Sequence, residues 1–253
     1  MVKLSALVKY LDDLLRVTEW KNADSSFNGL QVEGSKDVSL VAFAVDACEQ
    51  TFALCRETGA QMLIAHHGLF WGEPLPLTGV HLRRVRLLLD SGISLYAAHM
   101  PLDFHPVLGH NACIARILEL ETKEPLTYEK GLPIGILARS DKPLELSQFI
   151  RRVDSSLQTS CRLLSFGPKM IQQIGIASGH GSRLLDQALS ARIDTFLTGE
   201  SSHTIYHFAR EFGVNVIFAG HYATEMPGLK ELSFHLAEHF RLETRILQAP
   251  TGL

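Results

Sequence analysis

The chain has 253 residues, of which 46% are hydrophobic and 20% are charged, and its formal net charge is −3. A chain of this size holds one large domain or two ordinary ones, with enough apolar residues for a sizeable core. The slightly acidic balance, with no dense stripe of Lys and Arg, argues against a nucleic acid as a bulk electrostatic partner. No apolar run approaches the roughly 20 residues of a membrane span. The 4 cysteines stand singly and indicate free thiols in a reducing compartment, so we expect a soluble, cytoplasmic protein.

Strand-like apolar runs alternate with helix-like segments along the chain, which favours an α/β fold with mixed or parallel sheets covered by helices. The first segment, residues 3–16, has apolar residues at helical spacing. It also carries Asp12 and Asp13, so it is predicted as an amphipathic helix rather than a signal peptide. The last predicted helix has Pro227 in its first turn. Helices are expected near residues 3–16, 47–58, 79–91, 109–119, 145–156, 181–192, 203–212 and 227–240.

Three strand-like runs, residues 62–65, 93–98 and 214–219, each lead into side chains that can bind a metal. The candidate ligands after these runs are His66, His67, Asp103, His221 and Glu225. Open α/β sheets bind ligands at the carboxyl ends of their strands, and imidazole with carboxylate suits zinc, iron, manganese and similar ions. Five ligands are more than one tetrahedral zinc needs, so we expect two divalent metal ions. Each segment alone could be an ordinary loop, but the three together indicate a metal site.

The two parts of the chain resemble each other in these runs. Residues 40–67 are echoed by residues 173–203, and residues 92–99 by residues 213–221. In the second echo a carboxylate lies four residues beyond the histidine, at Asp103 and at Glu225. The pattern predicts two pseudo-repeated α/β halves with the metal site in the crevice between them. The alternative is chance similarity between apolar runs.

Residues 121–131 are polar and contain Pro125, so we expect them to link the halves. The first half would then comprise residues 1–124 and the second half residues 125–240. A final strand near residues 244–248 could return to the first half, which would add residues 241–253 to it.

Five motifs in this order resemble the Ngg-one-interacting-factor-three-like family, whose members also carry the name GTP cyclohydrolase 1 type 2. They are residues 27–32 (Phe-Asn-Gly-Leu-Gln-Val), 66–71, 99–111, 199–203 and 220–225. The resemblance covers nearly the whole chain. It implies two interlinked α/β domains, a dinuclear metal centre and a toroidal homohexamer built as a trimer of dimers. By motif, the family's metal ligands fall on the same five residues, His66, His67, Asp103, His221 and Glu225.

Three further residues are candidates for catalysis. His99 could hydrogen-bond a liganding group or transfer a proton, or it could be an ordinary histidine at a strand end. Glu200 and His203 occupy the repeat positions of the first half's metal histidines, so they are expected to support the site or contact substrate, with helix capping as the alternative. Residues 178–182 are interpreted as a tight turn rather than a phosphate loop. Six other histidines match no ligand spacing: His105, His110, His180, His207, His235 and His239.

The resemblance implies hydrolytic opening of a purine nucleotide ring, although the sequence contains no recognisable guanine pocket. Two ions sharing Glu225 would activate a water molecule, and His99 or His203 would handle the proton of the leaving group. A dinuclear phosphoesterase is one alternative function. A non-catalytic metal-binding or regulatory interaction protein is another. The ligand types suit iron, zinc, manganese or nickel without deciding among them.

Overall fold

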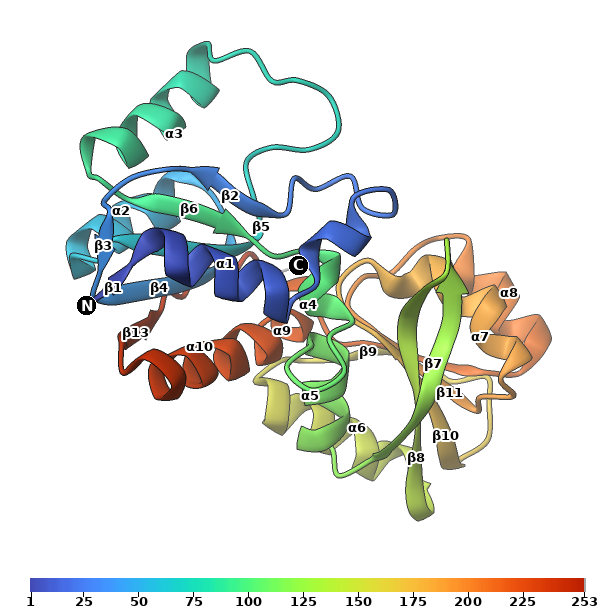
Figure 1. The fold of residues 1–253 in the computed structure, drawn as a ribbon. Coiled ribbons are helices and arrows are strands. Elements are labelled where there is room, and N and C mark those ends of the chain that lie inside the picture. The colour runs from blue at the N-terminus through green and yellow to red at the C-terminus, as the bar shows by residue number, and fades with distance from the viewer. Residues whose placement is uncertain (253) are drawn as a thin grey trace. The chain divides into compact units, whose positions relative to one another are not determined.

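The computed structural model describes residues 1–252, which fall into two compact units, each with its own sheet (Figure 1). Unit 1 comprises Met1–Leu102 together with Leu229–Ala249, and unit 2 comprises Asp103–Gly228 together with the residues from Pro250 on. The fold is the mixed α/β architecture predicted from the sequence. None of the helices within residues 1–252 is long and apolar enough to cross a membrane.

The sheet of unit 1 has five strands in the order β13-β4-β5-β6-β2. Strands β13, β4, β5 and β6 run parallel, and β2 is antiparallel to β6. The strands are β2 (Gly29–Val32), β4 (Leu40–Asp46), β5 (Met62–His67), β6 (Ser94–Ala97) and β13 (Glu243–Ile246). Two further strands, β1 (Val2–Lys3) and β3 (Asp37–Val38), pair with each other outside this sheet. The helices are α1 (Leu4–Leu14), α2 (Glu49–Thr58), α3 (Gly79–Asp90) and most of α10 (Pro227–Phe240), with a 3-10 turn at Val17–Trp20.

Helices cover both faces of this sheet, which explains why its central strands are continuous apolar runs. The face that carries Leu63 and Leu95 packs in one core with Phe52 of α2 and Leu88 of α3. Tyr96 belongs to the alternate side of β6 and is fully buried, and its hydroxyl donates a 2.8 Å hydrogen bond to Asp12 of α1. Burial and the charge of Asp12 raise the pKa of Tyr96 well above its ordinary value. Asp12, one of the two acidic residues in the predicted first helix, therefore fixes α1 to the sheet.

The sheet of unit 2 has six strands in the order β7-β8-β10-β11-β12-β9, of which β10, β11 and β12 are parallel to one another. The strands are β7 (Glu121–Glu129), β8 (Leu132–Glu145), β9 (Arg162–Leu164), β10 (Met170–Ala177), β11 (Thr195–Thr198) and β12 (Asn215–Phe218). The helices are α5 (His110–Ile117), α6 (Leu146–Leu157), α7 (Leu185–Ser190), α8 (Ile205–Phe212) and α9 (His221–Thr224), with a 3-10 turn at Gly181–Leu184 before α7. α5 and α6 share one core with the sheet, whereas α7 and α8 lie on the other side of it (Figure 1).

The internal similarity predicted from the sequence is present in the topology. In unit 1, β4 is followed by α2 and by β5, which pairs in parallel with it, and β6 then adds to β5. In unit 2, β10 is followed by α7 and by the parallel strand β11, and β12 then adds to β11. The candidate metal-binding motifs therefore follow equivalent strands of two similar units.

The prediction that residues 121–131 link the two halves is wrong, because these residues form β7 and the turn into β8. Glu129 pairs with Leu132, and Lys130 and Gly131 make the turn with φ values of 51° and 82°. Pro125 is tolerated because β7 is the edge strand of its sheet. The chain instead passes from unit 1 to unit 2 at Leu102 and Asp103, within the short helix α4 (Met100–Asp103). It returns to unit 1 at Leu229, and β13 pairs in parallel with β4.

Candidate metal-binding groups

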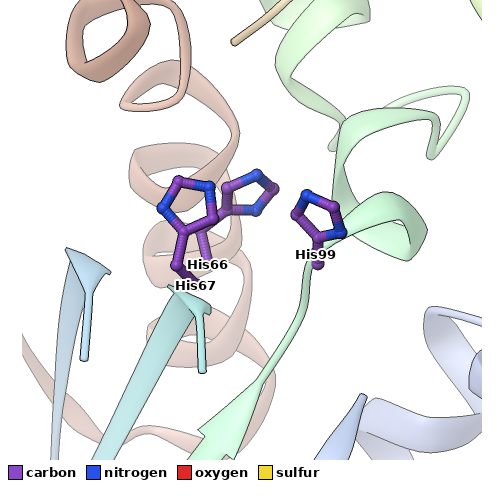
Figure 2. A group of neighbouring side chains, drawn as sticks. All are labelled: His66, His67 and His99. Carbon is purple, nitrogen blue, oxygen red and sulfur yellow. The ribbon is translucent and has the colours of Figure 1, made fainter. Parts of the chain in front are cut away.

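Three histidines of unit 1 lie together at one edge of its sheet (Figure 2). His66 and His67 end β5, and His99 follows β6 by two residues. The two strands are parallel neighbours in which Ala65 pairs with Ala97, so their carboxyl ends meet. One ring nitrogen of each histidine lies within 4.8 Å of the other two, close enough for one metal ion to reach all three.

The Nδ1 atom of each of these histidines is held by an oxygen that accepts a hydrogen bond. His66 Nδ1 donates to Ala98 O at 2.8 Å, His67 Nδ1 to Asp46 Oδ1 at 2.9 Å, and His99 Nδ1 to Asp24 Oδ1 at 2.9 Å. Carbonyl and carboxylate oxygens only accept, so Nδ1 carries a proton and Nε2 is the nitrogen that a neutral ring would offer to a metal. Metal-ligating histidines have this arrangement, with the second ring nitrogen bonded to a carboxylate or carbonyl. The three imidazoles therefore fit a divalent metal.

Asp24 is a buried carboxylate whose surroundings keep it ionised, with only 1% of its side chain exposed. Burial raises its pKa, but hydrogen bonds from His99, Asn28 and the Ser26 backbone outweigh burial and leave the pKa below its usual value. Asn28 also accepts a 2.7 Å hydrogen bond from the backbone N–H of His99. The loop around Asn28 thus fixes both the ring and the backbone of His99.

In unit 2 four side chains form a chain of ion pairs that includes two of the predicted ligands. His221 begins α9, and Glu225 follows one turn later. His221 Nδ1 lies 2.5 Å from Glu200 Oε1, and His221 Nε2 lies 2.9 Å from Glu225 Oε1. The second oxygen of Glu200 lies 2.8 Å from His180 Nδ1. Glu200 thus holds His221 on the side away from Glu225, as Asp46 holds His67 in unit 1.

The charges in this series of ion pairs shift the pKa values of His221 and Glu200. Burial lowers the pKa of His221, but the carboxylates of Glu225 and Glu200 raise it more, to about 9. Hydrogen bonds from His180 and His221 outweigh burial and lower the pKa of Glu200. A divalent cation at His221 Nε2 would take the place of the imidazolium proton, because a ligating imidazole must be neutral. The donor set of imidazole and buried carboxylate fits a divalent metal in this unit as well.

The loop at Ser178 and Gly179 lies beside all three predicted ligands of unit 2, which are Asp103, His221 and Glu225. Ser178 Oγ donates a 2.7 Å hydrogen bond to Asp103 Oδ1, and Asp103 is nearly buried. Gly179 has a φ of +56°, and a Cβ atom there would clash with Glu225 Oε1 and lie 3.2 Å from His221 Nε2. Asp103, His221 and Glu225 therefore converge on one two-residue loop, whose glycine leaves room for the carboxylate.

The remaining predicted site residue, His203, lies in different surroundings, and Asn111 joins two segments of the site. His203 is exposed, and its side chain makes no hydrogen bond to any residue described. Asn111 spans two groups, donating to Asp103 O at 3.1 Å and accepting from the Ser178 N–H at 2.8 Å. Sequence reasoning missed Asp24, Asp46 and the contact of His180 with Glu200. Only Asp46 had a usable signal, because it ends the apolar run of β4 and pairs in register with His67.

The fold and these groups define a class: an α/β protein whose strand ends carry histidine and carboxylate clusters able to hold metal ions. A family model described as Duf34/NIF3 (NGG1p interacting factor 3) matches residues 2–251. The chain belongs to this family, and the resemblance inferred from its motifs is confirmed.

Curated relatives and solved structures match over the full length. A protein of Deinococcus radiodurans named GTP cyclohydrolase 1 type 2 homolog is 40% identical over 247 residues, covering 98% of this chain and 93% of the relative. The crystal structure of TTHA1606 from Thermus thermophilus has a TM-score of 0.91 at 39% identity, and that of protein ybgI, described as of unknown function, has 0.93 at 30%. Both structures match over 100% of each chain.

Proposed function

We propose that the protein is a dinuclear metal-dependent hydrolase that acts on a purine nucleotide or a related small molecule. The observation that carries the proposal is the hydrogen bonding of the histidine rings: each of the candidate ligands His66, His67 and His221 has its Nδ1 bonded to an oxygen, which orients the ring and supports Nε2 as the proposed metal-binding atom. The substrate class follows the name of the relatives, GTP cyclohydrolase 1 type 2 homolog. The proposed ligands are His66, His67, Asp103, His221 and Glu225.

The proposed metal pair would be iron, zinc, manganese or nickel, since imidazole and carboxylate suit all four. Such a pair would supply a water molecule of lowered pKa and polarisation of the oxygen at the bond under attack. The chain's own residues orient the proposed ligands. Asp46 and Glu200 orient His67 and His221 by their Nδ1 atoms, and Ser178 orients Asp103.

His99 is the proposed proton-transfer residue. Its ring is oriented by the buried Asp24 carboxylate, and in this role its Nε2 would accept or give a proton at the leaving group instead of binding metal. His203, which is exposed, is retained as a second candidate, and Glu200 as a supporting residue. The four cysteines are all free, which supports the expectation of a reducing, cytoplasmic compartment.

Glu225→Gln tests the metal pair most directly. The substitution keeps the volume of the side chain but removes the charge that would hold two cations together, so the variant should retain at most one tightly bound metal per chain. The rate of any hydrolysis should fall by roughly several powers of ten, because activation of water and polarisation of the oxygen both depend on the metal pair. Elemental analysis of protein purified without added metal or chelator gives the first readout, and an assay against GTP, other nucleotides and phosphate esters gives the second.

Two matched variants complete the experiment. Glu200→Gln should be milder, because Glu200 is proposed to orient His221 rather than bind metal, and Glu238→Gln on the exposed side of α10 should change nothing. Full metal content in Glu225→Gln with loss in Glu200→Gln would show that the ligand set is wrong. Hydrolysis of phosphate esters without nucleotide ring opening would favour the phosphoesterase, and metal binding with no turnover the non-catalytic protein.

A further inference from the structure

A cavity of about 750 Å³ opens in unit 2 beside the carboxyl ends of β11 and β12. Its lining includes Ser160, Arg162, Glu200, Ser201, Phe218 and Tyr222. We propose that this cavity binds a phosphorylated metabolite that carries a planar ring, of about the size of a nucleoside monophosphate.

The topology of the sheet explains how these side chains meet. β11 and β12 are parallel, so the loops that follow them, which contain Glu200 and Tyr222, leave the sheet at the same edge. β9 runs antiparallel to β12 and places Arg162 directly opposite Phe218. Carboxyl ends of strands in α/β sheets are the usual place for small-molecule sites. The cavity therefore lies where the fold offers a site, and four separate segments build it, the fourth being Pro250 and Gly252 near the end of the chain.

The charges of the lining favour an anion at one end. Arg162 is the only basic residue that lines the cavity, it is exposed, and it makes no ion pair within residues 1–252. A guanidinium presents two parallel N–H donors that match a phosphate group. Glu200 is the only acidic residue in the lining, and its two oxygens are already paired with His180 and His221. The positive charge of Arg162 is thus available, whereas the negative charge of Glu200 is compensated.

The size and the aromatic residues indicate what the anion is attached to. Pockets for small organic ligands measure roughly 300–1,000 Å³, so this cavity is too large for a phosphate ion alone. Phe218 is nearly buried and Tyr222 is half-buried in its wall, and aromatic side chains of this kind stack on planar rings. The hydroxyls of Ser160 and Ser201 are exposed and can bond to polar groups around such a ring or its sugar.

A ligand in this cavity would touch the carboxylate that orients a candidate metal ligand. Glu200 lines the cavity, and its Oε1 bonds to His221 Nδ1. The link from the cavity to the metal rests on the proposed function, whereas binding in the cavity does not require metal. The two ideas can therefore fail separately.

Isothermal titration of the full chain with AMP, GMP, CMP and UMP tests the inference, with the matching nucleosides and inorganic phosphate titrated in parallel. At least one nucleotide should bind more tightly than its nucleoside and more tightly than phosphate. Arg162→Ala should weaken that binding by about tenfold or more, because a charge-assisted contact to phosphate is lost. Arg210→Ala, which removes an exposed arginine of α8 outside the cavity, should leave it unchanged.

Two controls make the result decisive. Arg162→Lys keeps the charge but not the paired donors, so its affinity should fall between those of the wild type and Arg162→Ala. The inference is overturned if no nucleotide binds, or if Arg162→Ala and Arg210→Ala behave alike. Elemental analysis of the same samples is the separate readout of the proposed function: Arg162-dependent binding without bound metal would contradict that function alone, and bound metal without such binding would contradict the cavity alone.

Discussion

Asp46 and Glu200 each hold one histidine by its Nδ1 atom, and the sequence predicted Glu200 as a supporting residue but missed Asp46. His66, His67 and His221 are recognisable because they closely follow apolar runs, and Glu225 because it lies four residues after His221; strand ends in an α/β fold are where ligands bind. The residues that orient them bond across the fold, 21 positions away in the chain for both His67 with Asp46 and His221 with Glu200. Such partners depend on strand register and loop conformation, which residue type and spacing alone do not reveal.

His67→Ala and Asp103→Ala should each reduce bound metal while leaving the chain folded. Both side chains lie at the ends of elements rather than in the two cores, so their removal costs little packing. Metal content by elemental analysis and the far-ultraviolet circular dichroism spectrum are the measurements, with the exposed His207→Ala as the control. Normal metal content in both variants would refute the site assignment.

At the scale of elements, the loop between β10 and the 3-10 turn at Gly181–Leu184 is the most constrained connection of the candidate site. Gly179→Ala should lower metal content as well as stability, because the added Cβ would push against the Glu225 carboxylate. The positive φ of +56° should cost roughly 1–2 kcal/mol in addition.

Gly59→Ala separates the two effects. Gly59 also has a positive φ, +74°, but nothing lies within 4 Å of the added Cβ. This variant should lose stability in chemical denaturation and keep its metal. Equal metal loss in both variants would mean that backbone strain, not contact with Glu225, affects the site.

The N-terminus of α6 gives a pH-dependent test. Glu145 accepts hydrogen bonds from the backbone N–H groups of Ser147 and Gln148, and these bonds, with the one from the Ser147 hydroxyl, lower its pKa. A carboxyl group whose pKa is lower in the folded state stabilises the fold above its unfolded-state pKa, and this stabilisation disappears as the pH falls through the folded-state pKa. Glu145→Gln should therefore lower the melting temperature at pH 7 and have little effect in strong acid.

Thermal melts of wild type and Glu145→Gln across the acid range provide the measurement, with the exposed Glu238→Gln as the control. A difference between wild type and Glu145→Gln that is constant from neutral to acid pH would show that the carboxylate charge does not stabilise the helix.

Elements were predictable where local pattern and tertiary context agreed. The helices at residues 3–16, 79–91 and 145–156 have clear amphipathic spacing and occur at α1, α3 and α6. β7 was missed because an edge strand buries little and can therefore be polar, and Pro125 removed a donor that an edge strand does not need. The predicted helix at residues 181–192 is not continuous. Its first turn is a 3-10 turn in which Gly181 packs against Thr198 and Ala177.

At the scale of the whole molecule, we propose the closed homohexamer that the family resemblance implies. Static light scattering at micromolar concentration should give a mass close to six times the 28.1 kDa of one chain. Cyclic and dihedral assemblies are closed, so the mass should stay constant as concentration rises. A monomer, or a mass that grows with concentration, would contradict the proposal.

The division of unit 1 between two parts of the chain has a consequence for synthesis on the ribosome. Domains generally fold as units, beginning with the one synthesised first. Here the residues synthesised first, Met1–Leu102, lack β13 and most of α10 until all of residues 103–228 have been made. The main part of unit 2, Asp103–Gly228, is continuous and can therefore fold before unit 1 is complete, and nascent unit 1 presents an unpaired edge of β4 during that interval. Until translation is complete, this topology leaves open a strand edge of the kind at which chains associate wrongly.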